Sequence, residues 1–449
     1  MEPADTPRPA VRQPRAVRRR WPWIAAALLV LVVGLVWSAM RSRVPVVWQR
    51  ETAEWIHCWS RDSMSFYTSE NDEERRRPER QQFFRRESAT GRLISEASLA
   101  MDSQKGWLVT ELPDGRVAVV DGNRLRVGPF ADDADADWVS RPIRLATDGT
   151  PADDEFTTTL AACRLVDDGQ TLRLVYNAAG EQRSGPDDEF GQPGVVDYSL
   201  PDLVRTDTVE LETGSYFGYS LVSPSGQTAI AHVPSATAAP IVMQRQVGGQ
   251  LTTQTVPGLE PVLVDLSTGP TMVIDRVFPA SVLGPYETLA DDRTFLKVDN
   301  SRSFSPSGKP RPRSPVEIVR LDGTGGQTWT LPAAINDAES LVISVQSSPT
   351  LITAAAESNL FSMPKFSLSK RKTCLLRLDD RQLNAPDPIA WSGWIEETNM
   401  AIFSFQTEPI RWDLMTRIVS PDGRWMREQS RTSGQARMID LSRLPPPPE

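Results

Sequence analysis

Histidine is nearly missing from this chain of 449 residues, which contains only His57 and His232. A Ser-His-Asp or Cys-His site needs one positioned base, but no G-x-S-x-G elbow accompanies either histidine. Neither residue lies at metal-ligand spacing from another ligand, which argues against a zinc site. We therefore interpret both as strand residues with ordinary hydrogen bonds. We assign no catalytic, cofactor-binding or metal-binding residue and expect no cofactor.

Cysteine is almost as scarce. Cys58, Cys163 and Cys374 are far apart, so the chain has no C-x-x-C metal or redox motif. One long-range disulfide would be possible in an oxidising compartment. We favour the alternative, in which each cysteine is buried as a small hydrophobic residue. A Walker loop and a G-x-G-x-x-G turn are also missing, so nucleotide binding has no support.

Lysine occurs six times, so the 49 basic residues are mostly arginine, which favours a GC-rich bacterial genome. Eight arginines and two acids precede residue 45, which leaves 41 basic and 56 acidic residues for the rest. A domain with this balance repels phosphate backbones. We therefore expect no nucleic-acid partner.

The stretch from Trp21 to Met40 is a long apolar run without a charged side chain. Twenty helical residues are long enough to cross roughly 30 Å of hydrocarbon, and a helix satisfies its own backbone hydrogen bonds in lipid. Trp21, Trp23 and Trp37 lie at its two ends, where indole rings favour the headgroup boundary. The run predicts one transmembrane helix over residues 21–40, which would make the membrane a partner.

The arginines around this run predict its orientation. Six precede it and only three follow it before residue 51, which favours an N-terminus inside the cell. The predicted location is the bacterial inner (cytoplasmic) membrane, with a single pass and an extracytoplasmic C-terminal domain. A cleaved signal peptide is the alternative, but the run is long for one and the junction WSAMRS lacks a small-x-small cleavage site.

The remaining chain divides into a tail, a linker and one large domain. Residues 1–20 are rich in Pro, Arg and Ala and predict a disordered cytoplasmic tail. Residues 41–47 predict a linker, residues 48–444 the ectodomain, and residues 445–449 a proline-rich tail. Short apolar stretches between Gly, Pro and Asp turns fill the ectodomain, without a helical period. The predicted fold class is all-β.

Turn motifs recur along the ectodomain, each between two apolar stretches. Pro sets φ near −65° early in such a turn, and the following Asp-Gly or Ser-Gly tolerates positive φ. The copies are LPDGR from Leu112, SPSGQ from Ser223 and SPDGR from Ser420, with degenerate copies in residues 163–177 and 286–299. A second element, VLVDLSTG from Val262 and RMIDLSRL from Arg437, predicts an outer strand that ends in Asp-Leu.

These motifs resemble the repeats of TolB-like and WD-repeat-like β-propellers over roughly residues 48 to 444. The resemblance implies a β-propeller of four-stranded blades, and turn positions recur every 54 to 74 residues. About 400 residues divided by about 55 gives about seven blades, with six or eight as alternatives. The segment FSPSGKPRPRSP from Phe304 departs from the pattern and predicts an inserted loop. Trp-Asp repeats are absent from the sequence, and an array of β-sandwiches is the alternative architecture.

Acid-rich and charged segments offer weaker candidates. A calcium site could form in a loop that contains Asp132, Asp133, Asp135 and Asp137, but these residues do not fit the EF-hand pattern. We favour a solvated loop there, and also at the acidic residues 153–155 and 187–189. The segment 322–329 is similar to an Asp-box turn with one extra residue, which we interpret as an ordinary turn. Segment 71–87 predicts a solvated excursion, or a docking site through Phe83 and Phe84.

Two classes of function agree with these observations. We favour a binding or scaffold module with a protein or glycan partner, because the sequence combines a repeat fold with no recognisable catalytic constellation. The alternative is a carboxylate-dependent hydrolase or lyase that draws its acids from several blades. Two acids that converge with Arg or Tyr near the centre of the ring would favour the enzyme.

Overall fold

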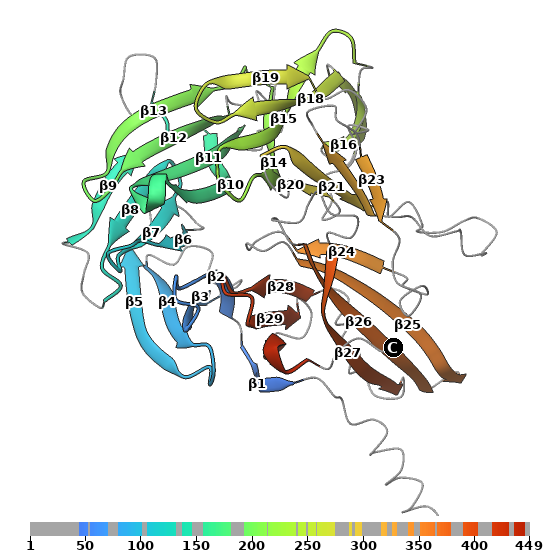
Figure 1. Ribbon diagram of the computed structural model, residues 1–449. Helices are drawn as coiled ribbons and strands as arrows, with labels where there is room; N and C mark the ends of the chain where they lie inside the picture. Colours follow the sequence, from blue (N-terminus) through green and yellow to red (C-terminus); the bar gives the residue numbers. More distant parts are fainter. Residues whose placement is uncertain are drawn as a thin grey trace, which may run out of the picture.

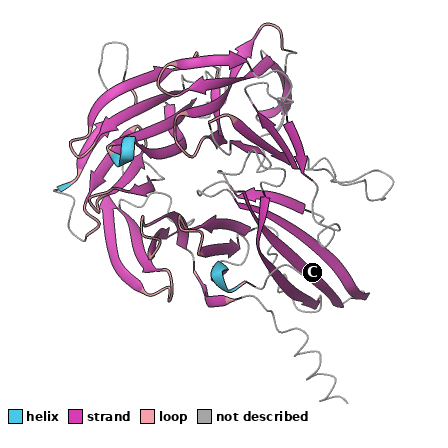
Figure 2. Ribbon diagram, in the orientation of Figure 1, coloured by secondary structure: helices cyan, strands magenta, loops and turns pink. Residues whose placement is uncertain are grey.

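The protein is all-β in the part of the chain that the computed structural model describes (Figures 1 and 2). That part contains thirty strands, two 3-10 helices, Asp167–Gly169 and Leu441–Arg443, and no α-helix. The described residues are 45–52, 54–70, 80–100, 106–131, 137–145, 156–180, 193–212, 214–238, 241–247, 250–256, 258–273, 287–289, 292–298, 316–320, 326–329, 340–344, 351–363, 366–378, 389–402, 415–430 and 435–444. Side chains of residues 295–417 are not described.

The strands form seven four-stranded antiparallel sheets, numbered here in chain order. Sheet 1 contains β2 (Glu54–Trp59), β3 (Ser65–Glu70), β4 (Arg80–Glu87) and β5 (Leu93–Ala100). Sheet 2 contains β6 (Gly106–Glu111), β7 (Val117–Asp121), β8 (Arg124–Gly128) and β9 (Val139–Pro142). Sheet 3 contains β10 (Phe156–Val166), β11 (Thr171–Gly180), β12 (Gly194–Ser199) and β13 (Val204–Glu210).

The second half of the chain repeats this arrangement. Sheet 4 contains β14 (Tyr216–Val222), β15 (Thr228–Ser235), β18 (Gly258–Asp265) and β19 (Gly269–Val273). Sheet 5 contains β20 (Glu287–Leu289), β21 (Thr294–Val298), β22 (Val316–Arg320) and β23 (Gly326–Trp329). Sheet 6 contains β24 (Ser340–Ser344), β25 (Leu351–Met363), β26 (Phe366–Leu378) and β27 (Ile389–Ile402). A two-stranded sheet of β16 (Ile241–Val247) and β17 (Gln250–Val256) is inserted in sheet 4.

Sheet 7 joins the two ends of the described chain. It contains β28 (Met415–Val419), β29 (Trp425–Ser430) and β30 (Gln435–Asp440), and β1 (Val46–Glu51) completes it as the fourth strand. The register runs from Val46 opposite Ile439 to Glu51 opposite Gln435. Figure 1 shows β1 in blue beside the red C-terminal strands. The strand begins two residues before the expected start of the domain at residue 48.

The predicted turns join the first and second strands of their sheets. Two of them, and a third turn that the sequence did not predict, share one bonding pattern. A serine donates its N–H to the carbonyl of the residue five positions on, and its Oγ accepts a hydrogen bond from the N–H of that same residue; the serines are Ser223, Ser420 and Ser60. The fourth residue of each turn has a φ of 60° to 71°; these residues are Ser63, Gly226 and Gly423. The copy at Ser60 escaped the sequence analysis because Ser63 replaces glycine.

The Asp-Leu element ends the third strand of its sheet, and a fourth strand lies beyond it. Asp265 at the end of β18 accepts a hydrogen bond from the Ser267 N–H at 2.9 Å, and Asp440 at the end of β30 accepts one from the Ser442 N–H at 3.1 Å. The sequence analysis assigned this element to the outer strand, but the structure places it in the third strand of the sheet. The leucine that follows each Asp is buried.

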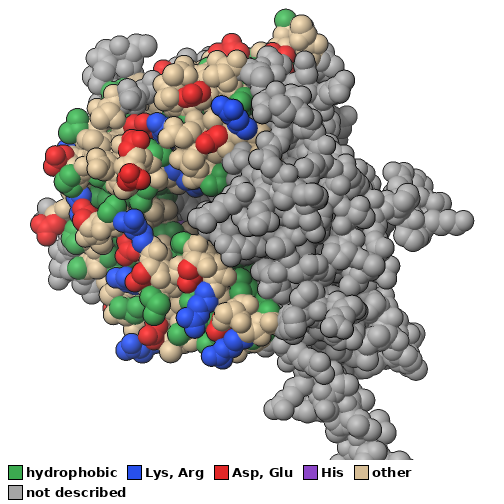
Figure 3. All heavy atoms as spheres, viewed as in Figure 1, with side chains coloured by type: hydrophobic (Ala, Val, Ile, Leu, Met, Phe, Trp, Pro, Cys, Tyr) green, Lys and Arg blue, Asp and Glu red, His purple; other side chains and the backbone are tan. Residues whose placement is uncertain are grey.

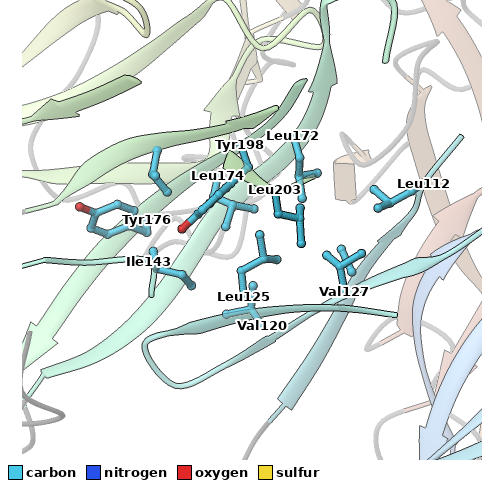
Figure 4. Close-up of a cluster of buried hydrophobic side chains, with 12 residues drawn as sticks. Leu112, Val120, Leu125, Val127, Ile143, Leu172, Leu174, Tyr176, Tyr198 and Leu203 are labelled. Carbon is cyan, nitrogen blue, oxygen red and sulfur yellow. The ribbon is translucent and has the colours of Figure 1, made fainter. Parts of the chain in front are cut away.

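Neighbouring sheets pack face to face, so the core is a series of layers between them. Figure 4 shows the layer between sheets 2 and 3, in which Leu125 and Val127 of β8 face Leu172 and Leu174 of β11. Sheets 7 and 1 share a similar layer, made by the buried side chains Ile418, Trp425, Met438, Ile56, Trp59 and Phe66. Packing of this kind fits the sheets of a propeller.

A membrane-spanning helix is not found among the described residues. The segment from Trp21 to Met40, which the sequence predicts to cross the membrane, lies outside them, as do the two predicted tails.

Candidate binding face

The connections between strands alternate between two ends of each sheet, because consecutive strands are antiparallel. We call the end with the first-to-second and third-to-fourth connections the short-turn end. The second-to-third connections, and the segments that lead from one sheet to the next, lie at the other end, which we call the loop-rich end.

The longest connections gather at the loop-rich end. Those of more than ten residues are 143–155, 181–193, 236–257, 274–286, 299–315 and 403–414. At the short-turn end most connections have three to six residues, and the two longest, 129–138 and 379–388, have ten. Binding residues are commonly carried on loops that a rigid scaffold positions. The loop-rich end is therefore the candidate binding face.

The inserted hairpin of β16 and β17 extends this face. β15 and β18 pair with each other from Thr228 opposite Asp265 to Ser235 opposite Gly258, so the sheet is complete without the insertion. The hairpin pairs internally from Ile241 opposite Val256. It is thus an addition to the loop-rich end and is not needed to complete the blade.

Two asparagines bind backbone groups of other segments near the loop-rich end, and the second of them joins sheet 3 to sheet 4. Asn123 donates from Nδ2 to the Arg144 carbonyl at 3.2 Å and accepts from the Arg144 N–H at 2.8 Å. Asn177 makes the same pair of bonds with Phe217, at 2.9 and 2.7 Å. Each amide satisfies a backbone donor and a backbone acceptor in the following segment. These bonds hold the bases of the long connections in place.

The histidines lie in different sheets, and the structure does not bring them together. In β2, the Nε2 atom of His57 lies 2.7 Å from the Ser69 Oγ. In β15, the ring of His232 stacks on that of Tyr216, with ring centroids 4.7 Å apart. Burial, and then the charge of Arg427, lowers the pKa of His57 to about 4. Burial alone lowers the pKa of His232 to about 4. Both imidazoles are therefore neutral at pH 7, as expected for packed strand residues.

Cys58 and Cys163 are free thiols that lie in the first strands of sheets 1 and 3. Burial raises the pKa of Cys163 to about 12 and also raises that of Cys58. A thiol with a raised pKa is a poor nucleophile at neutral pH. Both are partly buried and pack against hydrophobic clusters, so they match the expected small hydrophobic residue in part. Cys374 lies in β26, where side chains are not described.

The buried carboxylates of the described residues are each paired with an arginine. One pair joins Asp197 to Arg173 through two hydrogen bonds, with N–O distances of 2.9 and 2.6 Å. The other pairs are Glu54 with Arg86, Glu111 with Arg85, Asp121 with Arg126, Glu428 with Arg437, and Asp440 with Arg443. An arginine partner neutralises the charge of a buried carboxylate and satisfies its hydrogen bonds, which suits a structural role. Within the described part of the chain, no group of three or more His, Cys, Asp or Glu side chains is placed to hold a metal.

A buried arginine marks the junction of sheets 7 and 1. Arg427 in β29 is fully buried and donates to the Gln429 side chain at 2.9 Å and to the Glu54 carbonyl at 3.1 Å. Its guanidinium lies 5.5 Å from the centre of the Phe66 ring. Burial lowers the pKa of Arg427 to about 9. Sequence reasoning missed this junction because its parts are more than 370 residues apart.

Several candidates from the sequence have a partial outcome. Phe83 is fully buried beside Tyr67 and Leu99, and residues 80–87 form β4, so the interpretation of 71–87 as a solvated or docking segment is wrong from residue 80 onward. Asp137 is exposed. The remaining candidate acids, at 132, 133, 135, 153–155 and 187–189, lie outside the described residues, as do residues 321–325.

A scan against protein-family models finds no match. A search of curated proteins also finds none.

Solved structures similar to the chain include two β-propeller domains. The Cps50 (Swd1) domain of Myceliophteria thermophila is 12% identical over 87% of this chain and 99% of that one, with a TM-score of 0.34. The propeller domain of the Trilobed protease from Pyrococcus furiosus is 8% identical over 87% and 96%, with a TM-score of 0.38.

A peptidase is also among the similar structures. The puromycin-hydrolyzing peptidase of Mycobacterium tuberculosis is 12% identical over 90% of this chain, with a TM-score of 0.37, and the chain spans 55% of its length. With scores this low, the assignment of the fold rests on the strand pairing described above.

Proposed function

We propose that this protein is a membrane-anchored, extracytoplasmic β-propeller with seven blades, which binds a protein or glycan partner through its loop-rich end. It is a TolB-like or WD-repeat-like propeller held in the bacterial inner membrane by residues 21–40, with its N-terminus inside. The gathering of the long connections at one end of the sheets is the observation that carries the binding role.

The sheets support a closed ring. Seven four-stranded sheets follow one another along the chain, and β1 completes the sheet that contains β28 to β30. Because β1 comes from the other end of the described chain and leads directly into sheet 1, its pairing with β30 fastens the last blade to the first and closes the ring. The buried layer between sheets 7 and 1, which includes Arg427, would then be the seam of the ring.

The paired carboxylates favour binding over hydrolysis. A glycosidase or lyase of the expected kind needs two carboxyl groups that face one substrate bond. The buried acids among the described residues are spread over sheets 1, 2, 3 and 7 and are held by arginines. A loop-rich face above packed and ion-paired sheets is the design of a binding platform.

Topology is tested with a reporter enzyme fused after Glu449. We expect reporter activity only outside the cytoplasm, and a protein that keeps Met40 and remains in the membrane fraction. Cytoplasmic activity would overturn the orientation. Release of a shortened soluble form would show that the signal-peptide alternative is right.

The binding face is tested by site-specific photo-crosslinking in cells. Ala236, exposed at the loop-rich end, is replaced by a photo-reactive amino acid, and Asp114, exposed at the short-turn end, serves as the matched control. We expect a discrete adduct from position 236 and none from position 114. The proposed face is wrong if position 114 alone yields the adduct, or if neither position does.

A further inference from the structure

The exposed large hydrophobic residues of the described chain share one location. All of them lie in turns of the short-turn end or in the first two residues of strands that begin there: Val47 (36% exposed), Met64 (57%), Leu93 (40%), Ile94 (48%) and Val204 (56%). Single exposed hydrophobic residues scattered over a surface would need no explanation. These residues are restricted to one end of the sheets, and that restriction needs an explanation.

Four of these five residues belong to one continuous surface around the start of β1. The Ser88 N–H donates to the Met64 carbonyl at 2.9 Å, which joins the turn 60–64 to the turn 88–92. The Asp422 N–H donates to the Ser63 Oγ at 3.2 Å, which joins the turn 420–424 to the turn 60–64. The Asp440 N–H donates to the Pro45 carbonyl at 3.1 Å and brings in residues 440–444. We call these four turns, with residues 45–47, 93 and 94, the anchor-proximal surface.

The length of chain before β1 limits how far this surface can lie from a membrane. Only residues 41–44 separate Met40, the end of the predicted membrane helix, from Pro45. A fully extended chain advances at most about 3.6 Å per residue, so Pro45 lies within about 18 Å of that end. The headgroup layer takes up roughly 5 to 7 Å of this distance. The anchor-proximal surface is thus held next to the bilayer.

The charges of this surface differ from those of the domain as a whole. The domain is acidic, but the exposed charged residues of the four turns are Arg61, Arg92, Arg424, Arg443, Asp62 and Asp422. The side chains of Arg92 and Arg443 are 74% and 72% exposed, although Glu87 and Asp440 lie within 4 Å of them. Figure 3 shows basic and hydrophobic side chains next to each other over the lower part of the described surface, where Figure 1 places β1, β4 and β5.

We infer that the anchor-proximal surface rests on the lipid bilayer, and that the propeller stands on its short-turn end with the loop-rich end facing away from the membrane. Met64, Leu93 and Ile94 contact the boundary between headgroups and acyl chains, and the exposed arginines contact lipid phosphates. The inference deepens the proposed function and rests on its membrane anchor. It explains why the candidate binding face is at the opposite end from the tether.

The test uses the full-length protein in vesicles of phosphatidylcholine and phosphatidylglycerol. An environment-sensitive fluorophore is attached to Met64→Cys or Ile94→Cys, and Ala236→Cys at the loop-rich end is the matched control. The unsubstituted protein measures labelling of the native thiols. We expect lipids that carry a quencher near the headgroup to reduce emission at least twofold at positions 64 and 94, with little change at position 236.

Two outcomes separate this inference from the function on which it rests. If alkaline extraction removes the protein from the vesicles, the anchor and the proposed function fail together. If the protein resists extraction but positions 64 and 94 are quenched no more than position 236, only the inference is overturned. A protein partner cannot produce the expected result, because the vesicles contain only lipid and this chain.

Discussion

Lowering the pH from 7 to 5 should destabilise this protein through its two histidines. Burial lowers the pKa of His57 and of His232 from 6.5 to about 4 in the folded protein. The unfolded chain therefore takes up protons first as the pH falls through 6.5. Stability is fully present above that pH, decreases between pH 6.5 and about 4, and loses nothing further from these groups below pH 4.

The size of the effect follows from the two pKa values. For one group that titrates at 6.5 unfolded and about 4 folded, the free energy of unfolding falls by about 2 kcal/mol between pH 7 and pH 5. His232 is 6% exposed, so solvent screens its charge little. Both histidines together should therefore lower the free energy of unfolding by about 4 kcal/mol.

Denaturant titrations of the full-length protein in detergent, at pH 7 and pH 5, measure this loss. His57→Gln and His232→Gln should each lose about 2 kcal/mol less than the unsubstituted protein, because glutamine does not titrate. The carboxylates are the same in all three proteins, so their contribution cancels. Since the chain has only two histidines, each variant also leaves a single imidazole to follow by NMR.

The NMR titration would expose an error directly. If the remaining imidazole titrates with a midpoint near 6.5, burial does not hold it neutral and the reasoning fails. The same holds if the variants and the unsubstituted protein lose equal stability between pH 7 and pH 5.

Three further changes probe the packing. Asp197→Ala should cost about 3 to 5 kcal/mol in a denaturant titration, because it leaves the charge of Arg173 buried without a counterion; a loss below 1 kcal/mol would contradict this. Gly423→Ala should lower the free energy of unfolding by about 1 to 2 kcal/mol through its positive φ alone. Gly226→Ala should lower it further, because the new Cβ would lie 2.9 Å from the Arg164 Cβ. Equal losses for the two variants would argue against this crowding. Deleting residues 416–444 should lower the melting temperature of the whole ectodomain, whereas unfolding near the original temperature would favour independent β-domains.

Turns and fold class were readable from the sequence because their chemistry is local. Proline followed by Asp-Gly or Ser-Gly favours the same tight turn wherever it occurs. The turns at Leu112, Ser223 and Ser420 each lie between two strands of one sheet, as expected. The all-β composition also followed from short apolar stretches without a helical period. The number of blades and the membrane span stay predictions.

Features that depend on neighbours escaped the sequence. Ser63 takes the left-handed conformation that glycine takes in the sister turns. Its N–H donates to the Ser60 carbonyl and its carbonyl accepts from the Ser88 Oγ, and these bonds hold it there. Phe83 belongs to a segment that looks charged and solvated, yet it is fully buried, because Leu108 and Val119 of sheet 2 pack in the same cluster. Local composition cannot reveal which face of a strand another sheet will cover.

The sequence by itself determined the repeated turns, the acidic balance and the apolar N-terminal run, because each depends on residues close together in the chain. The tertiary structure decided that β1 pairs with β30, almost 390 residues away, and that Arg427 is buried against the Glu54 carbonyl. It also decided which hydrophobic side chains stay exposed and that the long connections share one end. These features arise from contacts between distant segments, whose free energy exists only once the sheets have assembled.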